Sequence, residues 1–420
     1  MFEKIEYKND VLYYDNVNVF EIAKQYDTPI YVYSKAKIVE NYNTYKTAFE
    51  KNNIAHFQIS YAVKANDNLT ILKILQQLGS GVDVVSVGEI KKALLAGFEP
   101  SKIVFSGVGK TEEELLFAMK NSIGQINIES YEEFETICEI AKQHNITTNI
   151  SVRINPNIDA HTHSKITTGK KDNKFGVSVE VGEKIFEKVN NNNEIKKYIH
   201  FNGFSVHIGS QILDISVFEK LFIFMKKLYQ KYENNFSTID FGGGIGIKYV
   251  DTDKTININE YIKLIKQYFH DFQGKIIVEP GRSIIGNAGI FLSKIVRIKK
   301  TENSNFIVLD GGMNNLIRPA MYDAFHYPMV VKKTKNNQKT YEVVGPICES
   351  SDVFCKNIDL NEVKEDDNYI AFLCAGAYGR SMASNYNSHN IAGELLIDND
   401  KIIEIRKSIS TEDLIKFEEF

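Results

Sequence analysis

Eight short β-rich runs alternate with amphipathic segments of helical length over most of the first 285 residues. The runs are residues 57–61, 82–85, 103–105, 125–128, 149–154, 203–206, 238–241 and 275–278. Such alternation predicts a parallel sheet whose strands are joined by helices. Eight strand–helix units in about 250 residues are typical of a closed (β/α)8 TIM barrel. A doubly wound open sheet is the alternative, because alternation alone does not distinguish closure from openness.

The pattern changes after residue 285. Short β runs at 307–309, 341–344, 369–373, 394–397 and 402–405 are separated by turns and polar loops, whereas 358–365 looks helical or irregular and 411–417 helical. This spacing predicts a separate all-β domain, either a sandwich or a barrel. We expect a (β/α)8 barrel over residues 35–285, and a β domain over 286–420 that also takes in the N-terminal strands of 1–34.

Composition excludes several classes of protein. The net charge of −4, from 50 basic and 54 acidic residues, gives no electrostatic basis for binding nucleic acid. No apolar run approaches the ~18 residues needed to span a membrane, and the N-terminus does not resemble a signal peptide. The four cysteines lack CxxC spacing. A cytoplasmic, reduced protein without structural zinc is therefore expected.

Chemically distinctive residues fall at or near the ends of all eight expected barrel strands. In chain order they are Lys64, Asp83, Ser106 with Gly107, Glu129, Arg153, His207, the glycines at 242–244, and the segment EPGR at 279–282. Active sites of TIM barrels are built at the C-terminal ends of the strands. The coincidence at eight strand ends therefore predicts an active site at that face of the barrel.

Lys64 lies in the segment YAVKAN (61–66), where a strand ends and a helix is about to begin. A buried lysine is almost always paired or reacted. Burial lowers the pKa of a lysine from about 10.4 and makes the free amine available for a Schiff base. The alternative is a lysine at a strand end whose ammonium group stays in water.

The last two strand ends predict a phosphate site. Three glycines at 242–244 allow backbone N–H groups to approach an anion, although an ordinary turn explains them equally well alone. TIM barrels frequently bind phosphate at the loops after strands seven and eight, where the pair Gly281–Arg282 also lies. A phosphate site, an amine and the carboxylate of Glu279 together suit pyridoxal phosphate. A phosphate-binding barrel without this cofactor is the simpler alternative.

Other polar residues have weaker signals. His207, in SVHIGSQ (205–211), is a candidate to stack on the cofactor ring, and Ser210 could donate to the phosphate. His161 and His163 lie in a polar loop without metal-site spacing, so no metal is expected. Cys348 and Glu349 lie together in GPICESSD (345–352), where the acid raises the chance that the cysteine handles protons.

The segments YAVKAN, SVHIGSQ, DFGGGIG, EPGR, GPICESSD and GAYG occur in this order over nearly the whole chain. Together they resemble the fold-type III pyridoxal-phosphate decarboxylases, and among them the diaminopimelate decarboxylase family. The resemblance implies an alanine-racemase-like barrel with a β domain, and a homodimer with shared active sites. It also implies decarboxylation of meso-2,6-diaminopimelate to L-lysine and CO2, the last step of lysine biosynthesis.

The resemblance also implies a role for individual residues. Lys64 would hold the cofactor, with His207, Gly243, Gly244, Glu279, Gly281, Arg282 and Tyr378 around it. Arg282, Arg318 and Tyr322 would bind the distal carboxylate of the substrate, and Glu349 its distal amine. Tyr378, in GAYG (376–379), would lie near the phosphate and the substrate. Cys348 of the neighbouring subunit would protonate the carbanion after CO2 leaves, and residues 162–175 match the family's lid.

Other activities remain open on the residues alone. A decarboxylase of ornithine, arginine or carboxynorspermidine is one, although ornithine and lysine lack the distal carboxylate that Arg318 would bind. A racemase is disfavoured by Glu279 and by the Cys348–Glu349 pair, and a non-enzymatic homologue usually loses the lysine or the cysteine. The run FLCA at 372–375 departs from the more polar run expected in the family, which affects only the packing behind Tyr378.

Overall fold

The computed structural model describes residues 3–159, 173–232, 236–334, 337–365 and 368–419. The chain divides into two compact units. One consists of residues 41–247 and 254–283, and the other of residues 1–40, 248–253 and 284–420. Among the described residues, no helix is both long and apolar enough to cross a membrane.

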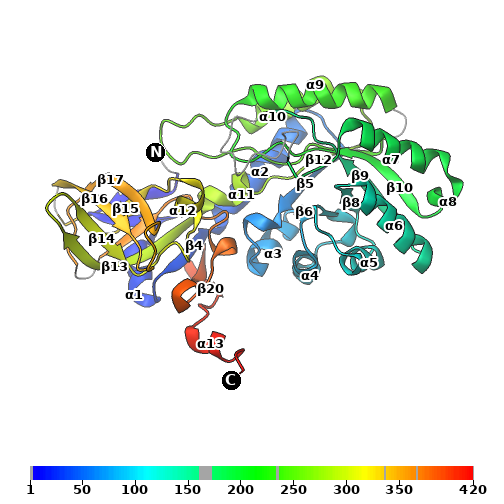
Figure 1. The fold of residues 1–420 in the computed structure, drawn as a ribbon. Coiled ribbons are helices and arrows are strands. Elements are labelled where there is room, and N and C mark those ends of the chain that lie inside the picture. Colours follow the sequence, from blue (N-terminus) through cyan, green and yellow to red (C-terminus); the bar gives the residue numbers. More distant parts are fainter. Residues whose placement is uncertain (1–2, 160–172, 233–235, 335–336, 366–367, 420) are drawn as a thin grey trace. The chain divides into compact units, whose positions relative to one another are not determined.

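The first unit is a closed barrel of eight parallel strands (Figure 1). The strands are β5 (Phe57–Ala62), β6 (Gly81–Val84), β7 (Ile103–Phe105), β8 (Gln125–Ile128), β9 (Thr148–Arg153), β10 (Ile199–Ser205), β11 (Thr238–Asp240) and β12 (Lys275–Val278). Each strand pairs in parallel with the next in the chain, and β12 closes the barrel against β5. The predicted TIM barrel is therefore confirmed, and the open sheet is excluded.

Helices connect these strands and cover the outside of the barrel (Figure 1). They are α2 (Lys35–Lys51), α3 (Leu69–Gln77), α4 (Val87–Ala96), α5 (Glu112–Lys120), α6 (Tyr131–His144), α7 (Val179–Asn191), α8 (Asn193–Lys196), α9 (Ile215–Tyr232), α10 (Ile258–Tyr268) and α11 (Arg282–Ile285). Several begin at a side-chain cap, as where the hydroxyl of Ser130 accepts the N–H of Glu133 at the start of α6. The capping residues therefore fix where the loops at the active-site face end.

The second unit is built on a nine-stranded mixed sheet (Figure 1). Its strands are β4 (Ile30–Ser34), β13 (Gly289–Lys300), β14 (Asn305–Leu309), β15 (Pro328–Val330), β16 (Gln338–Val344), β17 (Val353–Asn361), β18 (Tyr369–Phe372), β19 (Gly393–Asp398) and β20 (Lys401–Arg406). The N-terminal strand β4 lies between β13 and β19, far from both in the sequence. The prediction that the β domain takes in N-terminal strands is confirmed.

Short elements complete this unit. A separate three-stranded sheet contains β1 (Ile5–Lys8), β2 (Val11–Tyr14) and β3 (Val17–Asn18), and the helices are α1 (Val19–Gln25), α12 (Arg318–Tyr322) and α13 (Thr411–Ile415). The expectation that residues 358–365 are helical or irregular was wrong for 358–361, which belong to β17. The alternation that would identify this strand is interrupted at Asn357, which has a positive φ of 50° beside a shift in the β16–β17 register.

Close packing at the start of β8 provides a stability test of the barrel. A Cβ on Gly124 would lie 2.1 Å from the carbonyl oxygen of Ser101, whereas a Cβ on Gly109 would have no neighbour within 4 Å. We expect Gly124→Ala to lower the free energy of unfolding by about 1–3 kcal/mol through overpacking. Gly109→Ala is the matched control and should leave it nearly unchanged. Urea unfolding followed by circular dichroism measures both, and equal midpoints for the two variants would contradict this packing.

Candidate active site

Lys64 lies on a single 3-10 turn, residues 63–65, directly after β5. Its Nζ donates to Oδ2 of Asp83 over 2.6 Å, and Asp83 is fully buried at the end of β6. The lysine side chain remains 35% exposed. The predicted lysine is therefore held by a buried carboxylate, although its side chain is only partly buried.

The loop after β12 packs directly against the Lys64 turn. A Cβ on Gly281 would lie 3.0 Å from Cβ of Ala62 and 3.1 Å from Cβ of Ala65, so only glycine fits without displacement. The N–H of Ala62 also donates to the carbonyl of Pro280 over 3.2 Å. These contacts bring Glu279 and Lys64 to the same mouth of the barrel.

Three buried carboxyl groups surround this point: Asp83, Asp240 at the end of β11, and Glu279. Burial raises the pKa of Glu279 well above its usual range, and the neighbouring Asp240 and Asp83 carboxylates raise it further. Burial also raises the pKa of Asp240 to about 7. Like charges in a buried site cannot all ionise, so the cluster keeps at least one proton, and Glu279 is its principal holder.

His207, after β10, has a defined tautomer. Its Nδ1 accepts the N–H of Gly243 over 3.1 Å, so in the neutral ring the proton is on Nε2. Burial lowers the pKa of His207 well below its ordinary range, and the cations of Arg153 and Lys64 lower it further. His207 is thus a neutral ring whose orientation is fixed by the backbone of the glycine segment.

The glycine segment, residues 242–244, packs so closely against neighbouring backbone that side chains would not fit there. A Cβ on Gly243 would lie 2.2 Å from the carbonyl of Glu279, and one on Gly244, which has a φ of 116°, would lie 2.7 Å from that of Gly209. Nearby, Nη2 of Arg282 donates to Oγ of Ser210 over 3.1 Å. The predicted phosphate-binding residues from the loops after β10, β11 and β12 therefore lie in one unit, with the Arg282–Ser210 pair formed directly.

A buried ionic network supports the other side of the barrel mouth. Oε1 of Glu129 accepts from Nη1 of Arg153 over 2.8 Å, and its Oε2 accepts the N–H of Gly176 over 2.7 Å. The Arg153 cation and that of Lys110 lower the pKa of Glu129 against the effect of its burial. Glu129 therefore ties β8 to β9 and to the backbone at Gly176.

The residues fit pyridoxal phosphate by an independent test. Oε1 of Glu279 is buried and has no hydrogen-bond partner among the described residues. An unpaired polar atom in a buried site is costly unless a ligand satisfies it. A proton-holding carboxyl suits the ring nitrogen of a pyridine, Lys64 supplies an amine, and the loops at Gly244 and Arg282 supply donors for a phosphate. The barrel mouth thus matches the cofactor in amine, ring and phosphate contacts.

In the β-sheet unit, Arg318 and Tyr322 lie at the two ends of the one-turn helix α12. Positions four residues apart share a helix face. Arg318 is buried and its Nη1 donates to the hydroxyl of Tyr249 over 3.0 Å, while Tyr322 is half-buried. The two predicted carboxylate binders are therefore neighbours on one turn.

Cys348 and Glu349 are exposed on the loop between β16 and β17. The carboxylate of Asp352 closes this loop by accepting the N–H of Ile347 over 2.7 Å and that of Met313 over 2.6 Å. Asn387 caps the loop through a 2.8 Å bond from the N–H of Cys348. The thiol is thus presented to solvent on a backbone that is fixed at several points.

The site residues predicted from the sequence are divided between the two units. Lys64, His207, Ser210, Gly243, Gly244, Glu279, Gly281 and Arg282 lie in the barrel unit, and Arg318, Tyr322, Cys348, Glu349 and Tyr378 in the β-sheet unit. Tyr378 follows β18 with a φ of 55°, a backbone conformation uncommon outside glycine. His161, His163 and positions 162–172 of the expected lid lie outside the described residues.

Sequence reasoning assigned no role to Asp240 and did not identify His326. The position of Asp240 at a strand end, immediately before the three glycines, was a usable signal. Among the residues that the structure describes, no group of three or more His, Cys, Asp or Glu is arranged to hold a metal ion.

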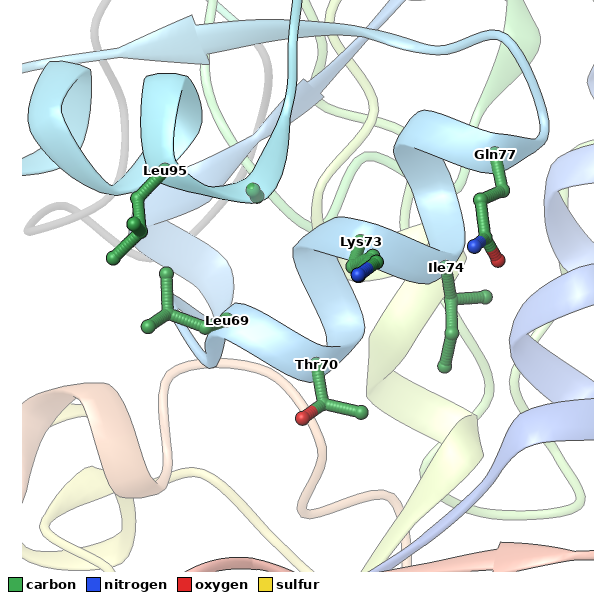
Figure 2. Close-up of a pocket in the computed structure, with 7 residues that line it drawn as sticks. Leu69, Thr70, Lys73, Ile74, Gln77 and Leu95 are labelled. Carbon is green, nitrogen blue, oxygen red and sulfur yellow. The ribbon is translucent and has the colours of Figure 1, made fainter.

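A pocket of about 290 Å³ lies away from these residues, on the surface of α3 and α4. Figure 2 shows Leu69 and Leu95 at one end of it, with Thr70, Lys73, Ile74 and Gln77 along α3. Leu95 is 74% exposed, and Lys73 is the only charged residue in the lining. Apart from the amine of Lys73, the pocket lining has no ionisable side chain.

Comparison with known proteins agrees with this site. A family model for the pyridoxal binding domain of pyridoxal-dependent decarboxylases matches residues 35–286. The diaminopimelate decarboxylase of Zymomonas mobilis is 40% identical over 98% of this chain and 97% of its own length. That of Helicobacter pylori is 41% identical over 96% of this chain and 98% of its own length.

Solved structures show the same relation. A diaminopimelate decarboxylase from M. jannaschii, in complex with L-lysine, has a TM-score of 0.91 and 35% identity, covering 98% of this chain and 97% of that one. The Helicobacter pylori enzyme with L-lysine has a TM-score of 0.88 and 40% identity, covering 95% and 98%. The chain belongs to the diaminopimelate decarboxylase family of pyridoxal-dependent decarboxylases.

Proposed function

We propose that this protein is a carboxy-lyase that converts meso-2,6-diaminopimelate to L-lysine and CO2 with pyridoxal phosphate, the last step of lysine biosynthesis. The observation that carries the proposal is the barrel mouth, where Lys64 contacts Asp83 and burial raises the pKa of the neighbouring Glu279. Relatives of this family were solved with L-lysine bound, which is the expected product.

Pyridoxal phosphate, when bound, supplies an aldehyde for amines and a ring that takes up the electron pair released when CO2 leaves. Lys64 supplies the amine that holds the aldehyde carbon. Asp83 receives the ammonium group of Lys64 whenever this amine is displaced by that of the substrate. The 2.6 Å contact would keep the lysine within the site while its amine is free.

Glu279 holds a proton at the pyridine nitrogen. A proton there makes the ring a strong electron acceptor, which loss of CO2 from a saturated carbon requires. The carboxylates of Asp240 and Asp83, which raise the pKa of Glu279, would also stabilise a positive charge on the ring nitrogen. His207 stacks on the ring, and its neutral state adds no charge that would oppose the ring cation.

The phosphate is bound by Ser210, Gly243, Gly244, Gly281 and Arg282, with Tyr378 nearby. Backbone N–H groups, a hydroxyl and a guanidinium are the donors that phosphate prefers. The Arg282–Ser210 hydrogen bond preorganises two of these side chains.

The distal end of the substrate bears both a carboxylate and an amine. Arg318, Arg282 and Tyr322 bind the carboxylate, with Tyr378 as a further contact, and Glu349 binds the amine. Charge-assisted hydrogen bonds contribute about 1.5–3 kcal/mol each. A diamino acid without the distal carboxylate leaves Arg318 without its partner, so specificity follows from this pair.

Cys348 protonates the carbon that has lost CO2, by donating from Sγ. Because Cys348 and Glu349 are exposed on their loop, they can serve the barrel of a second subunit. We propose a homodimer with active sites shared in this way. All four cysteines are free thiols, which supports the proposed cytoplasmic location.

The substrate is tested by CO2 release from the protein with added pyridoxal phosphate, on meso-diaminopimelate, ornithine, lysine and arginine in parallel. We expect release from diaminopimelate with lysine as the product, and discrimination of roughly 10⁴–10⁵ against the others, because buried donors would remain unpaired. Release from ornithine or arginine at a comparable rate would refute the assignment of the distal pocket.

Replacement of Lys64 tests the cofactor assignment. Lys64→Ala should abolish the visible absorbance of the lysine-bound cofactor and lower kcat by at least about 10³-fold, since the variant lacks the amine nucleophile. Lys73→Ala, on the exposed surface of α3, is the matched control and should retain both. Retention of the absorbance in Lys64→Ala would refute its role.

Replacement of Cys348 tests proton donation across the interface. Cys348→Ala should retain the cofactor absorbance and lower kcat by about 10²–10⁴-fold, the usual contribution of a general acid. Cys138→Ala on α6 is the control and should be unaffected.

Mixing Lys64→Ala with Cys348→Ala should restore roughly a quarter of the native activity, because half of randomly reassorted dimers contain one intact site. Sedimentation of the mixture verifies that dimers have formed. Absence of recovery in mixed dimers would contradict shared sites.

A further inference from the structure

His326 is a buried histidine in the β-sheet unit with no part in the chemistry above. Its Nε2 lies 2.8 Å from Nη1 of Arg318, and its Nδ1 lies 3.1 Å from the carbonyl oxygen of Leu373. The same Nη1 of Arg318 donates to the hydroxyl of Tyr249. One nitrogen of the guanidinium is therefore held by two side chains from different segments of the chain.

The geometry fixes the protonation of His326. A guanidinium nitrogen can only donate, so Nε2 must accept and cannot bear a proton. A carbonyl oxygen can only accept, so Nδ1 must donate to Leu373. His326 is consequently a neutral imidazole in a single tautomer, and both of its nitrogens are used.

The imidazole is itself held in place. The hydroxyl-bearing ring of Tyr249 packs edge-to-face on it, with the centroids 5.3 Å apart and the planes at 85°. The backbone just beyond His326 is anchored where Leu373 donates its N–H to the carbonyl of Tyr327 over 3.0 Å. His326 is thus a rigid acceptor rather than a mobile side chain.

We propose that His326 is a positioning residue that sets specificity for the distal carboxylate: together with Tyr249 it fixes the plane of the Arg318 guanidinium. This inference rests on the proposed function of Arg318. Carboxylate recognition by arginine depends on the direction of its planar donor fork. Two acceptors on one Nη1 determine that plane, which a single contact would leave free to rotate.

The charge of Tyr249 and His326 matters as much to Arg318 as their positions. A tyrosine hydroxyl and a neutral imidazole orient the guanidinium without cancelling its charge. By contrast, Arg153 in the barrel is held by the carboxylate of Glu129. These two contacts therefore orient Arg318 without placing a competing negative charge on Nη1.

The test compares two ligands that differ only in that carboxylate. L-lysine retains it, and 1,5-diaminopentane lacks it. Their dissociation constants are measured on the holoenzyme by titrating the cofactor absorbance. The dissociation constant of 1,5-diaminopentane divided by that of L-lysine is the ratio that reports carboxylate recognition.

His326→Gln places an amide oxygen near the position of Nε2 and should keep the ratio within about threefold of native, by restoring the acceptor. His326→Met has a similar length without an acceptor and should lower the ratio by about 10–100-fold, the range of one charge-assisted hydrogen bond. In His326→Met the KM for diaminopimelate should rise while kcat is largely kept. A merely structural role would instead lower the thermal midpoint and kcat of both variants without changing the ratio.

A native ratio in His326→Met would overturn the inference. Arg318→Met distinguishes failure of the positioning role from failure of the proposed function. If Arg318→Met also leaves the ratio native, Arg318 does not bind the carboxylate. If His326→Met does not fold, Tyr249→Phe decides, because it removes the other acceptor and keeps the ring. We expect a smaller loss of the ratio in that variant, and a native ratio there would likewise refute the positioning role.

Discussion

The ion pair between Lys64 and Asp83 depends on a barrel interior that excludes most water. Transfer of a charge into such an interior costs several kcal/mol unless a partner compensates it. Here one cation faces three carboxyl groups, and the excess is relieved because Glu279 and Asp240 bind protons more strongly than usual. A site of this kind favours the arrival of another cationic group. A protonated pyridine nitrogen beside Glu279 is such a group, so the electrostatics of the barrel mouth favour the ring that the chemistry requires.

Glycine residues allow three loops to pack closely at the barrel mouth: the loop with Lys64, the loop with Gly243 and the loop with Gly281. The carbonyl of Glu279 occupies the space that a Cβ of Gly243 would need, and the methyl groups of the Lys64 turn occupy that of Gly281. The N–H of Gly243 in turn orients His207. The glycines therefore do more than expose backbone donors to an anion. They set the distances between the amine, the carboxyl group and the imidazole.

Much of the barrel could be predicted from the sequence because strand alternation and strand-end chemistry are local signals. The same reasoning placed the start of β10 at residue 203, whereas the strand begins at Ile199. The difference arises at a register shift between Phe201 and Gly203, where Gly203 has a φ of 155°. It also missed β13, whose apolar first half and charged second half fit no single periodicity. The proximity of Asp240 to Glu279, and of His326 to Arg318, depends on tertiary folding and has no local signature.

Two of the buried arginines, Arg153 and Arg318, show how the same side chain acquires different functions. Arg153 is paired with Glu129, and this pair ties two strands to the backbone at Gly176. Its charge is satisfied within the protein, so its role is mainly structural, with a secondary effect on His207. Arg318 donates from Nη1 to a hydroxyl and lies beside an imidazole nitrogen, and neither of these two groups carries a negative charge. Both side chains are buried, so the chemical identity of their neighbours, rather than burial, separates the structural Arg153–Glu129 pair from the proposed recognition residue.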